Sequence, residues 1–176
     1  MMSFDDGVQA GDSQTMTHPV FRRVLVSVQD ASQVEDAVEL ARRACVPGVT
    51  EAHVLHLNLR ESIRGRRFTL ETESEASYVV EATVFELRMA DIGASGQVGH
   101  ALFDAAAEAI VADAAAWRAD LIVLGYPRRG GLRTRLFGSV TLRVLQHAPC
   151  PVLVASSASK DRHHRGEKER YAGHRS

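Results

Sequence analysis

Residues 119–155 read ADLIVLGYPRRGGLRTRLFGSVTLRVLQHAPCPVLVA, and this stretch decides the fold. Asp120–Leu124 is a short apolar run, which is typical of a parallel strand that is buried on both faces. A glycine- and arginine-rich loop follows over Gly125–Phe137. We expect a helix to start near Gly138–Ser139 and to end before Pro149, because the residue that precedes a proline is biased away from the helical conformation.

The same alternation extends over the rest of the chain. Apolar runs alternate with segments in which apolar residues recur at helical spacing. The expected strands are Val24–Val28, Ala52–Leu57, a weak one at Asp91–Gly96, Asp120–Leu124 and Pro151–Ala155, with further helices over 34–45, 75–89 and 104–117. The charged residues 60–74 are expected to form an exposed loop. The order βαβαβαβαβ predicts an α/β fold in which helices cover both faces of a five-stranded, mostly parallel sheet.

Composition limits the classes of protein to consider. The chain has 176 residues, 45% of them hydrophobic, and a formal net charge of -1. We expect disordered tails over 1–20 and 157–176, which are polar and lack helical or strand periodicity, and one domain over 21–156. The balanced charge argues against nucleic acid as a partner, and no apolar run is long enough to cross a membrane. The N-terminal residues do not form a secretory signal, so we expect a cytoplasmic protein.

The cysteines and histidines favour structural roles. Cys45 and Cys150 are far apart in sequence, so we interpret both as small buried hydrophobic residues without a disulfide. His53 and His56 are three residues apart on one strand and therefore face opposite ways, which excludes a metal pair. His163, His164 and His174 lie in the charged tail, where solvated side chains are the favoured interpretation.

Two segments follow strands of the predicted sheet and could bind a ligand. In such sheets ligands bind beyond the carboxyl ends of the strands, which here are Gln29–Ser32 and Gly125–Thr141. The loop glycines and a helix N-terminus at Gly138–Ser139 would suit a phosphate, and the loop arginines would neutralise its charge. Gly131 stands where a Walker A motif needs lysine, so the loop is not a Walker loop. The pattern fits a plain strand-to-helix connection with Ser139 as the helix N-cap equally well.

Two blocks of the chain resemble the universal stress protein family: RRVLVSVQDASQVEDAVELA at 22–41, and the stretch quoted above. The resemblance covers roughly 22–155 and implies a Rossmann-like sheet and a homodimer formed through the last strand, at Val152, Leu153 and Val154. Many members of the family bind ATP through a G-x2-G-x9-G-[ST] motif. Here Gly125 and Gly138–Ser139 match the motif, Arg128 replaces its second glycine, and Gln29 stands where the family has a ribose-binding aspartate. The candidate nucleotide-binding residues are Gln29, Asp30, Gly125, Arg128, Gly130, Gly138, Ser139, Val140 and Thr141.

The resemblance and the departures from its motif lead to three functional hypotheses. The preferred one is a regulatory or scaffolding protein of the stress response with a degenerate or weak adenine-nucleotide site. The alternative is a competent ATP-binding sensor in which Arg128 replaces the missing glycine contact. An enzyme is the least favoured, because the chain lacks G-x-S-x-G, H-E-x-x-H and a Walker lysine. Asp30 could bind the ribose in place of Gln29, but a turn or helix cap is its preferred role.

Overall fold

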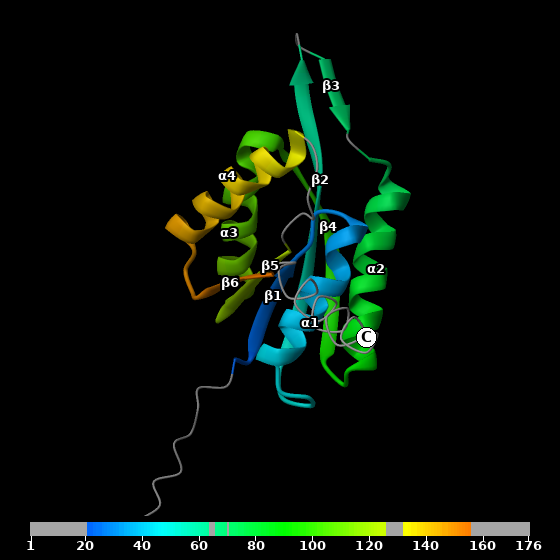
Figure 1. The fold of residues 1–176 in the computed structure, drawn as a ribbon, viewed down its shortest axis with the longest axis vertical. Helices are drawn as coiled ribbons and strands as arrows, with labels where there is room; N and C mark the ends of the chain where they lie inside the picture. Colours follow the sequence, from blue (N-terminus) through cyan, green and yellow to red (C-terminus); the bar gives the residue numbers. More distant parts are fainter. Residues whose placement is uncertain (1–20, 64–65, 70, 126–131, 156–176) are drawn as a thin grey trace, which may run out of the picture.

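Five parallel strands form the centre of the structure, a computed structural model that describes residues 21–63, 66–69, 71–125 and 132–155 (Figure 1). The strands are β1 (Arg23–Ser27), β2 (Glu51–Ile63), β4 (Gly93–Leu102), β5 (Leu121–Gly125) and β6 (Val152–Ala155). Their spatial order is β4-β2-β1-β5-β6, so the first strand of the chain is the central one. This confirms the predicted α/β class and the mostly parallel sheet.

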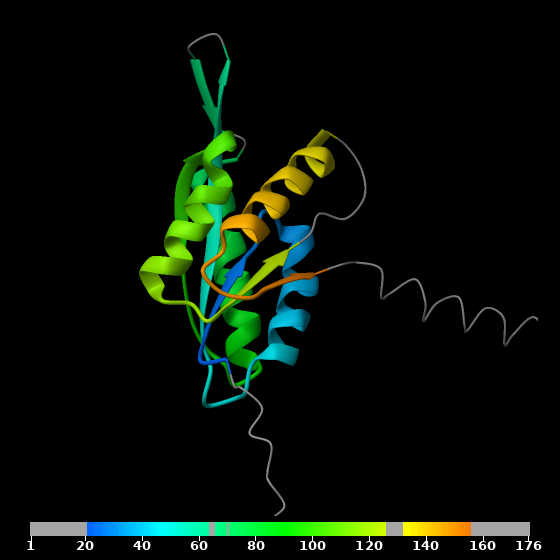
Figure 2. The same cartoon turned by 90° about the vertical axis from the view of Figure 1, so that its left-hand side faces the viewer.

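Helices cover both faces of the sheet (Figures 1 and 2). One face packs against α1 (Val34–Ala44) and α2 (Glu73–Met89), and the other packs against α3 (Ala106–Trp117) and α4 (Leu132–His147). Along β1, Val24 and Val26 join the first apolar layer and Leu25 joins the second, and all three are fully buried. Burial on both faces explains why β1 reads as a continuous apolar run rather than an alternating one.

The strand β4 is longer than its weak sequence signal predicted. It pairs with β2 in parallel over Glu51–Arg60, and two glycines allow this pairing. A Cβ atom on Gly96 would lie 2.6 Å from Cγ1 of Val80, and one on Gly99 would lie 2.8 Å from Cδ2 of Leu57. The glycine spacing of this segment therefore serves close packing of helix and strand against β4.

Two boundary predictions are wrong. The segment 60–74 is not a loop: β2 continues to Ile63, β3 (Arg66–Thr69) pairs with it antiparallel, and α2 begins at Glu73. The two strands extend beyond the rest of the domain (Figures 1 and 2). The last helix begins at Leu132 rather than near Gly138, because the residues between them continue the helix and Gly138 is tolerated inside it at a cost of about 1 kcal/mol.

Some predictions fall on residues that the structure does not describe. The tail assignments over 1–20 and 157–176 and the three tail histidines lie outside the described residues, as do Arg128 and Gly130. Within the described part of the chain, no helix is long and apolar enough to cross a membrane.

Candidate functional site

The strand order reverses between β1 and β5, which lie side by side in the middle of the sheet. Ser27 is paired with Leu124, so the carboxyl ends of the two strands meet at the same edge. The chain continues from β1 to β2 on one side of this point and from β5 to β6 on the other. Open α/β sheets bind ligands at such a switch in strand order. The structure thus brings the predicted residues Gln29, Asp30 and Gly125 together. We call this place the β1–β5 junction.

A residue that the sequence analysis missed, Gln33, fills the junction. Its side chain is fully buried, and its Oε1 accepts a hydrogen bond of 2.9 Å from the backbone N–H of Gln29. A Cβ atom on Gly125 would lie only 2.6 Å from the same Oε1. The absence of a side chain at Gly125 therefore provides the room that Gln33 occupies.

Asp30 caps the short helix η1 (Ala31–Gln33), as the preferred sequence interpretation predicted. Its Oδ1 accepts a hydrogen bond of 2.8 Å from the backbone N–H of Ser32 and another from the hydroxyl of Ser32. Its Oδ2 accepts a longer bond of 3.3 Å from Nε2 of Gln33. A capping residue followed three positions later by Gln is a known helix-start pattern, and it was the signal that could have revealed Gln33 in the sequence.

Gln29 is half-buried, and one of its polar atoms has no partner among the described residues. Its Nε2 donates to Oγ of Ser27 at 3.1 Å. Its Oε1 is buried and lacks a hydrogen bond from any described residue. A buried acceptor of this kind costs stability, and so a donor at this position would be favourable.

An open cleft of ≈ 560 Å³ lies between η1 and the start of α2, and it is lined by Asp30, Ala31, Glu71, Ser74, Glu75, Tyr78 and Val79. Three of these residues are carboxylates, and none of the described lining residues is Lys or Arg, so we call it the acidic cleft. Hydrogen bonds from the backbone and side chain of Thr72 hold the pKa of Glu75 below its usual range. Glu75 therefore remains ionised at neutral pH.

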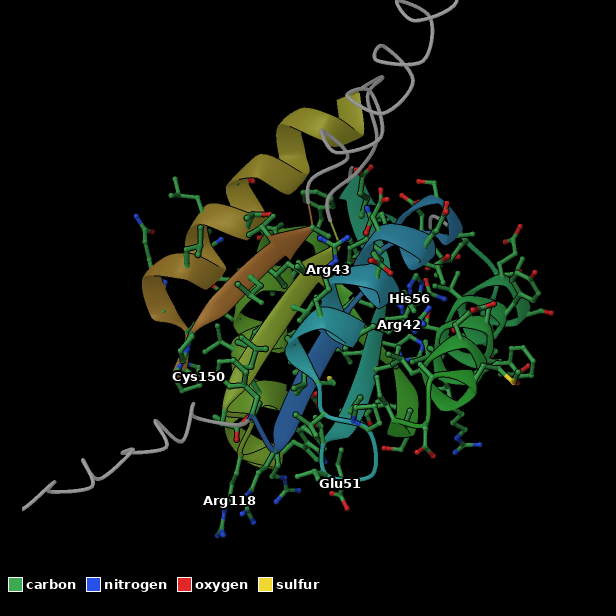
Figure 3. All side chains as sticks on the ribbon, turned by 60° about the horizontal axis from the view of Figure 1, so that its bottom comes forward. Arg42, Arg43, Glu51, His56, Arg118 and Cys150 are labelled. Carbon is green, nitrogen blue, oxygen red and sulfur yellow. The ribbon has the colours of Figure 1, made fainter. Side chains whose placement is uncertain are left out.

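The buried His56 connects the cleft to the end of β1, and Figure 3 shows it among the side chains between the sheet and α2. Its Nδ1 lies 2.9 Å from the carbonyl oxygen of Val28, which can only accept, so Nδ1 carries a proton. Its Nε2 lies 2.5 Å from Oε1 of Glu71. The predicted structural role of His56 is confirmed, because the side chain joins β1, β2 and the segment before α2.

His53 points to the opposite face of the sheet, as predicted, and stacks on Trp117 with ring centroids 5.4 Å apart. Its Nδ1 lies 3.2 Å from Oγ of Ser95, and its Nε2 lies 3.6 Å from Oδ2 of Asp113. Burial raises the pKa of Asp113, although His53 and a hydrogen bond from Gln97 oppose the rise. The His53–Asp113 separation is longer than a hydrogen bond. Among the described residues, no cluster of acidic, histidine or cysteine side chains could hold a metal ion.

The residues at the predicted phosphate site are placed differently from expectation. Gly138 is the seventh residue of α4, so by helical geometry its backbone N–H is paired inside the helix. Ser139 is exposed, Thr141 is half-buried, and Val140 packs into the apolar layer against α3. The prediction that a helix N-terminus opens at Gly138–Ser139 is therefore wrong.

The edge strand β6 and the helix α4 each carry exposed leucines. In the described part of the chain β6 pairs only with β5, which leaves its other edge unpaired. Leu153 on β6 is 36% exposed, and Leu142 and Leu145 on α4 are 56% and 50% exposed. Leu153 is in register with Val123 and therefore lies on the face of α1, whereas α4 covers the other face. A large aliphatic side chain at this exposure on a free strand edge marks a surface that can associate.

Comparison with known proteins agrees with this architecture. A universal stress protein of Methanocaldococcus jannaschii, MJ0531, is 48% identical over 44 residues, which is 25% of this chain and 26% of that protein. Among solved structures, hypothetical protein MJ0577 covers 78% of this chain and 96% of its own, with 20% identity and a TM-score of 0.60. The universal stress protein from Archaeoglobus fulgidus, solved in complex with dAMP, covers 78% of this chain and 100% of its own, with 23% identity and a TM-score of 0.52. The family model of universal stress proteins matches residues 21–156, which is most of the chain, and the protein therefore belongs to the universal stress protein family.

Proposed function

We propose that this protein is a cytoplasmic regulatory or scaffolding dimer of the stress response, without catalytic activity, whose adenine-nucleotide site is degenerate. The observation that carries the proposal is the position of α4. Because the helix begins at Leu132, the residues Gly138 and Ser139 that match the ATP-binding motif lie inside it and offer no free backbone donors to a phosphate. Arg128 and Gln29 depart from the same motif in sequence.

The charge of the acidic cleft supports the same proposal. A triphosphate held near Asp30, Glu71 and Glu75 would bring like charges together. At about 4 Å, each pair of unit charges repels by roughly 1 to 4 kcal/mol, depending on how much water screens it. Charge of this sign disfavours ATP more than it disfavours a nucleoside, which carries no phosphate.

The dimer is proposed to form through β6, with the exposed Leu153 at its centre. Pairing of two β6 edges would satisfy the free backbone groups of the strand. The side chain of Leu153 would supply apolar area to the interface. A dimer of this kind would offer partner proteins two copies of each surface.

One observation favours the alternative, a competent nucleotide-binding sensor. The universal stress protein from Archaeoglobus fulgidus has the same fold and was solved with dAMP. In this chain the unpartnered Oε1 of Gln29 would be satisfied by a ligand hydroxyl or amine at the β1–β5 junction. The sensor would use these groups and Arg128 in place of the missing glycine contact.

Calorimetry separates the two functions. The freshly purified protein is denatured, any released small molecule is identified by mass spectrometry, and ATP and AMP are then titrated into the protein. The degenerate site predicts no released nucleotide and no heat with ATP up to millimolar concentration. Micromolar ATP binding that the double variant Gly138→Ala, Ser139→Ala abolishes would refute the proposal in favour of the sensor.

A further inference from the structure

The side chain of Gln33 occupies the β1–β5 junction, the place where a ligand is expected to bind. It is fully buried, it is held by two polar contacts, and it sits against a glycine that leaves room for nothing larger than hydrogen. We propose that Gln33 is an internal ligand of this site, and that a nucleoside binds by displacing it. This inference rests on the proposed function, because it assigns the weakness of the nucleotide site to a named side chain.

The two contacts of Gln33 define the chemistry that can replace it. The backbone N–H of Gln29 offers a donor to Oε1, and Oδ2 of Asp30 offers an acceptor to Nε2. The unpartnered Oε1 of Gln29 is a further acceptor. A replacing group must therefore present a hydrogen-bond acceptor beside one or more donors, which is the pattern of a nucleobase edge or of a ribose diol.

A phosphate does not fit this pattern. A fully ionised phosphate has no donor for Asp30, and it would place its charge beside the Asp30 carboxylate. The ligand class that suits the junction is therefore a neutral nucleoside group, with any phosphate held farther along the edge of the sheet. The Asp30 carboxylate should therefore lower the affinity for ATP more than it lowers the affinity for adenosine.

The local backbone allows Gln33 to leave. Gln33 ends η1, a helix of three residues, and one backbone hydrogen bond of 3.1 Å joins its N–H to the carbonyl of Asp30. A rotation of the side chain out of the junction breaks the contacts to Gln29 and Asp30 but leaves this backbone bond in place. Each side-chain hydrogen bond raises the equilibrium constant for the state with Gln33 inside the junction by a factor of roughly 2 to 12. The two bonds together therefore lower the apparent affinity for a ligand by roughly 5- to 150-fold.

The test is calorimetric titration of adenosine into the full chain and into Gln33→Ala, which opens the junction. Gln97→Ala is the matched control, since Gln97 donates a comparable hydrogen bond to Asp113 on the other face of the sheet. We expect Gln33→Ala to bind adenosine 5- to 150-fold more tightly than the parent chain, and Gln97→Ala to match the parent. Gln33→Asn draws the carboxamide back by one methylene, and its adenosine affinity should lie between those of the parent chain and Gln33→Ala. It is used in place of Gln33→Ala if circular dichroism shows that Gln33→Ala does not fold.

The outcomes keep this inference separate from the proposed function. Adenosine affinity of Gln33→Ala within twofold of the parent, or no binding by either protein up to 10 mM, overturns the internal-ligand role while a degenerate site survives. Micromolar ATP binding by the parent chain overturns the degenerate site instead. In that case tighter adenosine binding by Gln33→Ala still supports displacement of Gln33, and unchanged binding refutes it.

Discussion

Gly125→Ala should destabilise the domain through Gln33 rather than through the backbone. The new Cβ atom would lie 2.6 Å from Oε1 of Gln33, closer than a Cβ atom approaches in real structures, and 3.0 Å from the Cβ of Gln33, which is a tight contact. The Oε1 must then move, which breaks its bond to the backbone N–H of Gln29. Overpacking of this kind costs about 1 to 3 kcal/mol, and the lower entropy of the unfolded chain returns about 0.4 to 1 kcal/mol. We expect a net loss of about 1 kcal/mol in the free energy of unfolding.

A double-mutant cycle tests the cause of this loss. Gln33→Ala removes the atom that the new methyl group strikes, although its Cβ still limits the space. The cost of Gly125→Ala should therefore fall by about 1 kcal/mol in the Gln33→Ala background, as a coupling between touching residues. Urea denaturation of the four proteins measures the cycle, provided that all four share one m-value.

Gly93→Ala is the matched control for the cycle. A Cβ atom on Gly93 would meet nothing closer than the carbonyl oxygen of Thr50 at 3.9 Å, an ordinary contact. We expect this variant to be neutral or slightly more stable than the parent. Additive effects of Gly125→Ala and Gln33→Ala within about 0.4 kcal/mol would show that the two side chains do not meet, and would refute the filled junction.

Three further predictions concern a thiol, a helix cap and an edge. Burial, assisted by the charge of Asp120, raises the pKa of the Cys45 thiol to about 11. The folded protein therefore holds this proton while the unfolded chain releases it, so stability should fall as the pH rises above 9. A thiol reagent should label Cys45 only after unfolding, and because Cys150 is only partly buried, the labelled residue is identified by mass spectrometry; labelling of Cys45 in the native protein at pH 8 would contradict this. Thr72→Ala removes the N-cap of α2 and should lower the free energy of unfolding by about 1 kcal/mol, measured by thermal unfolding. Because Thr72 lowers the pKa of Glu75, the stability difference between variant and parent should shrink as the pH falls below about 4.5. A difference that stays constant with pH would show that Glu75 does not contribute to the cap. Leu153→Arg places a charge on the free edge of β6 and should turn a dimer into a monomer by light scattering, whereas an unchanged mass would place the interface elsewhere.

Apolar patterning was enough to predict the layers of the fold. Runs such as Leu121–Leu124 are buried on both faces, and their alternation with helical segments determines the class. The strand β4 was weak in sequence because its glycines carry no side chains, and its length comes from pairing with β2. The hairpin of β2 and β3 was missed because its strands are rich in charged residues, whereas antiparallel pairing needs only backbone groups in register.

The candidate site was harder to predict from sequence. Gln29, Asp30 and Gly125 lie at one edge of the sheet, as expected, because the ends of parallel strands meet there. The start of α4 was misplaced because glycine was taken as a boundary signal, although tertiary packing overrides such a weak preference. The capping pattern marks Gln33 as part of a helix start, but its place in the junction depends on the space left by Gly125, a residue far away in sequence.

The central position of β1 has a consequence for synthesis on the ribosome. Among the described strands β1 emerges first, yet one of its two neighbours, β5, begins at Leu121, near the end of the domain. At about 5 to 20 residues per second, the nascent chain waits roughly 5 to 20 s with one edge of β1 uncovered. During that interval the edge is open to other chains. Expression level and temperature should therefore affect the yield of soluble protein more than the stability of the finished domain would suggest.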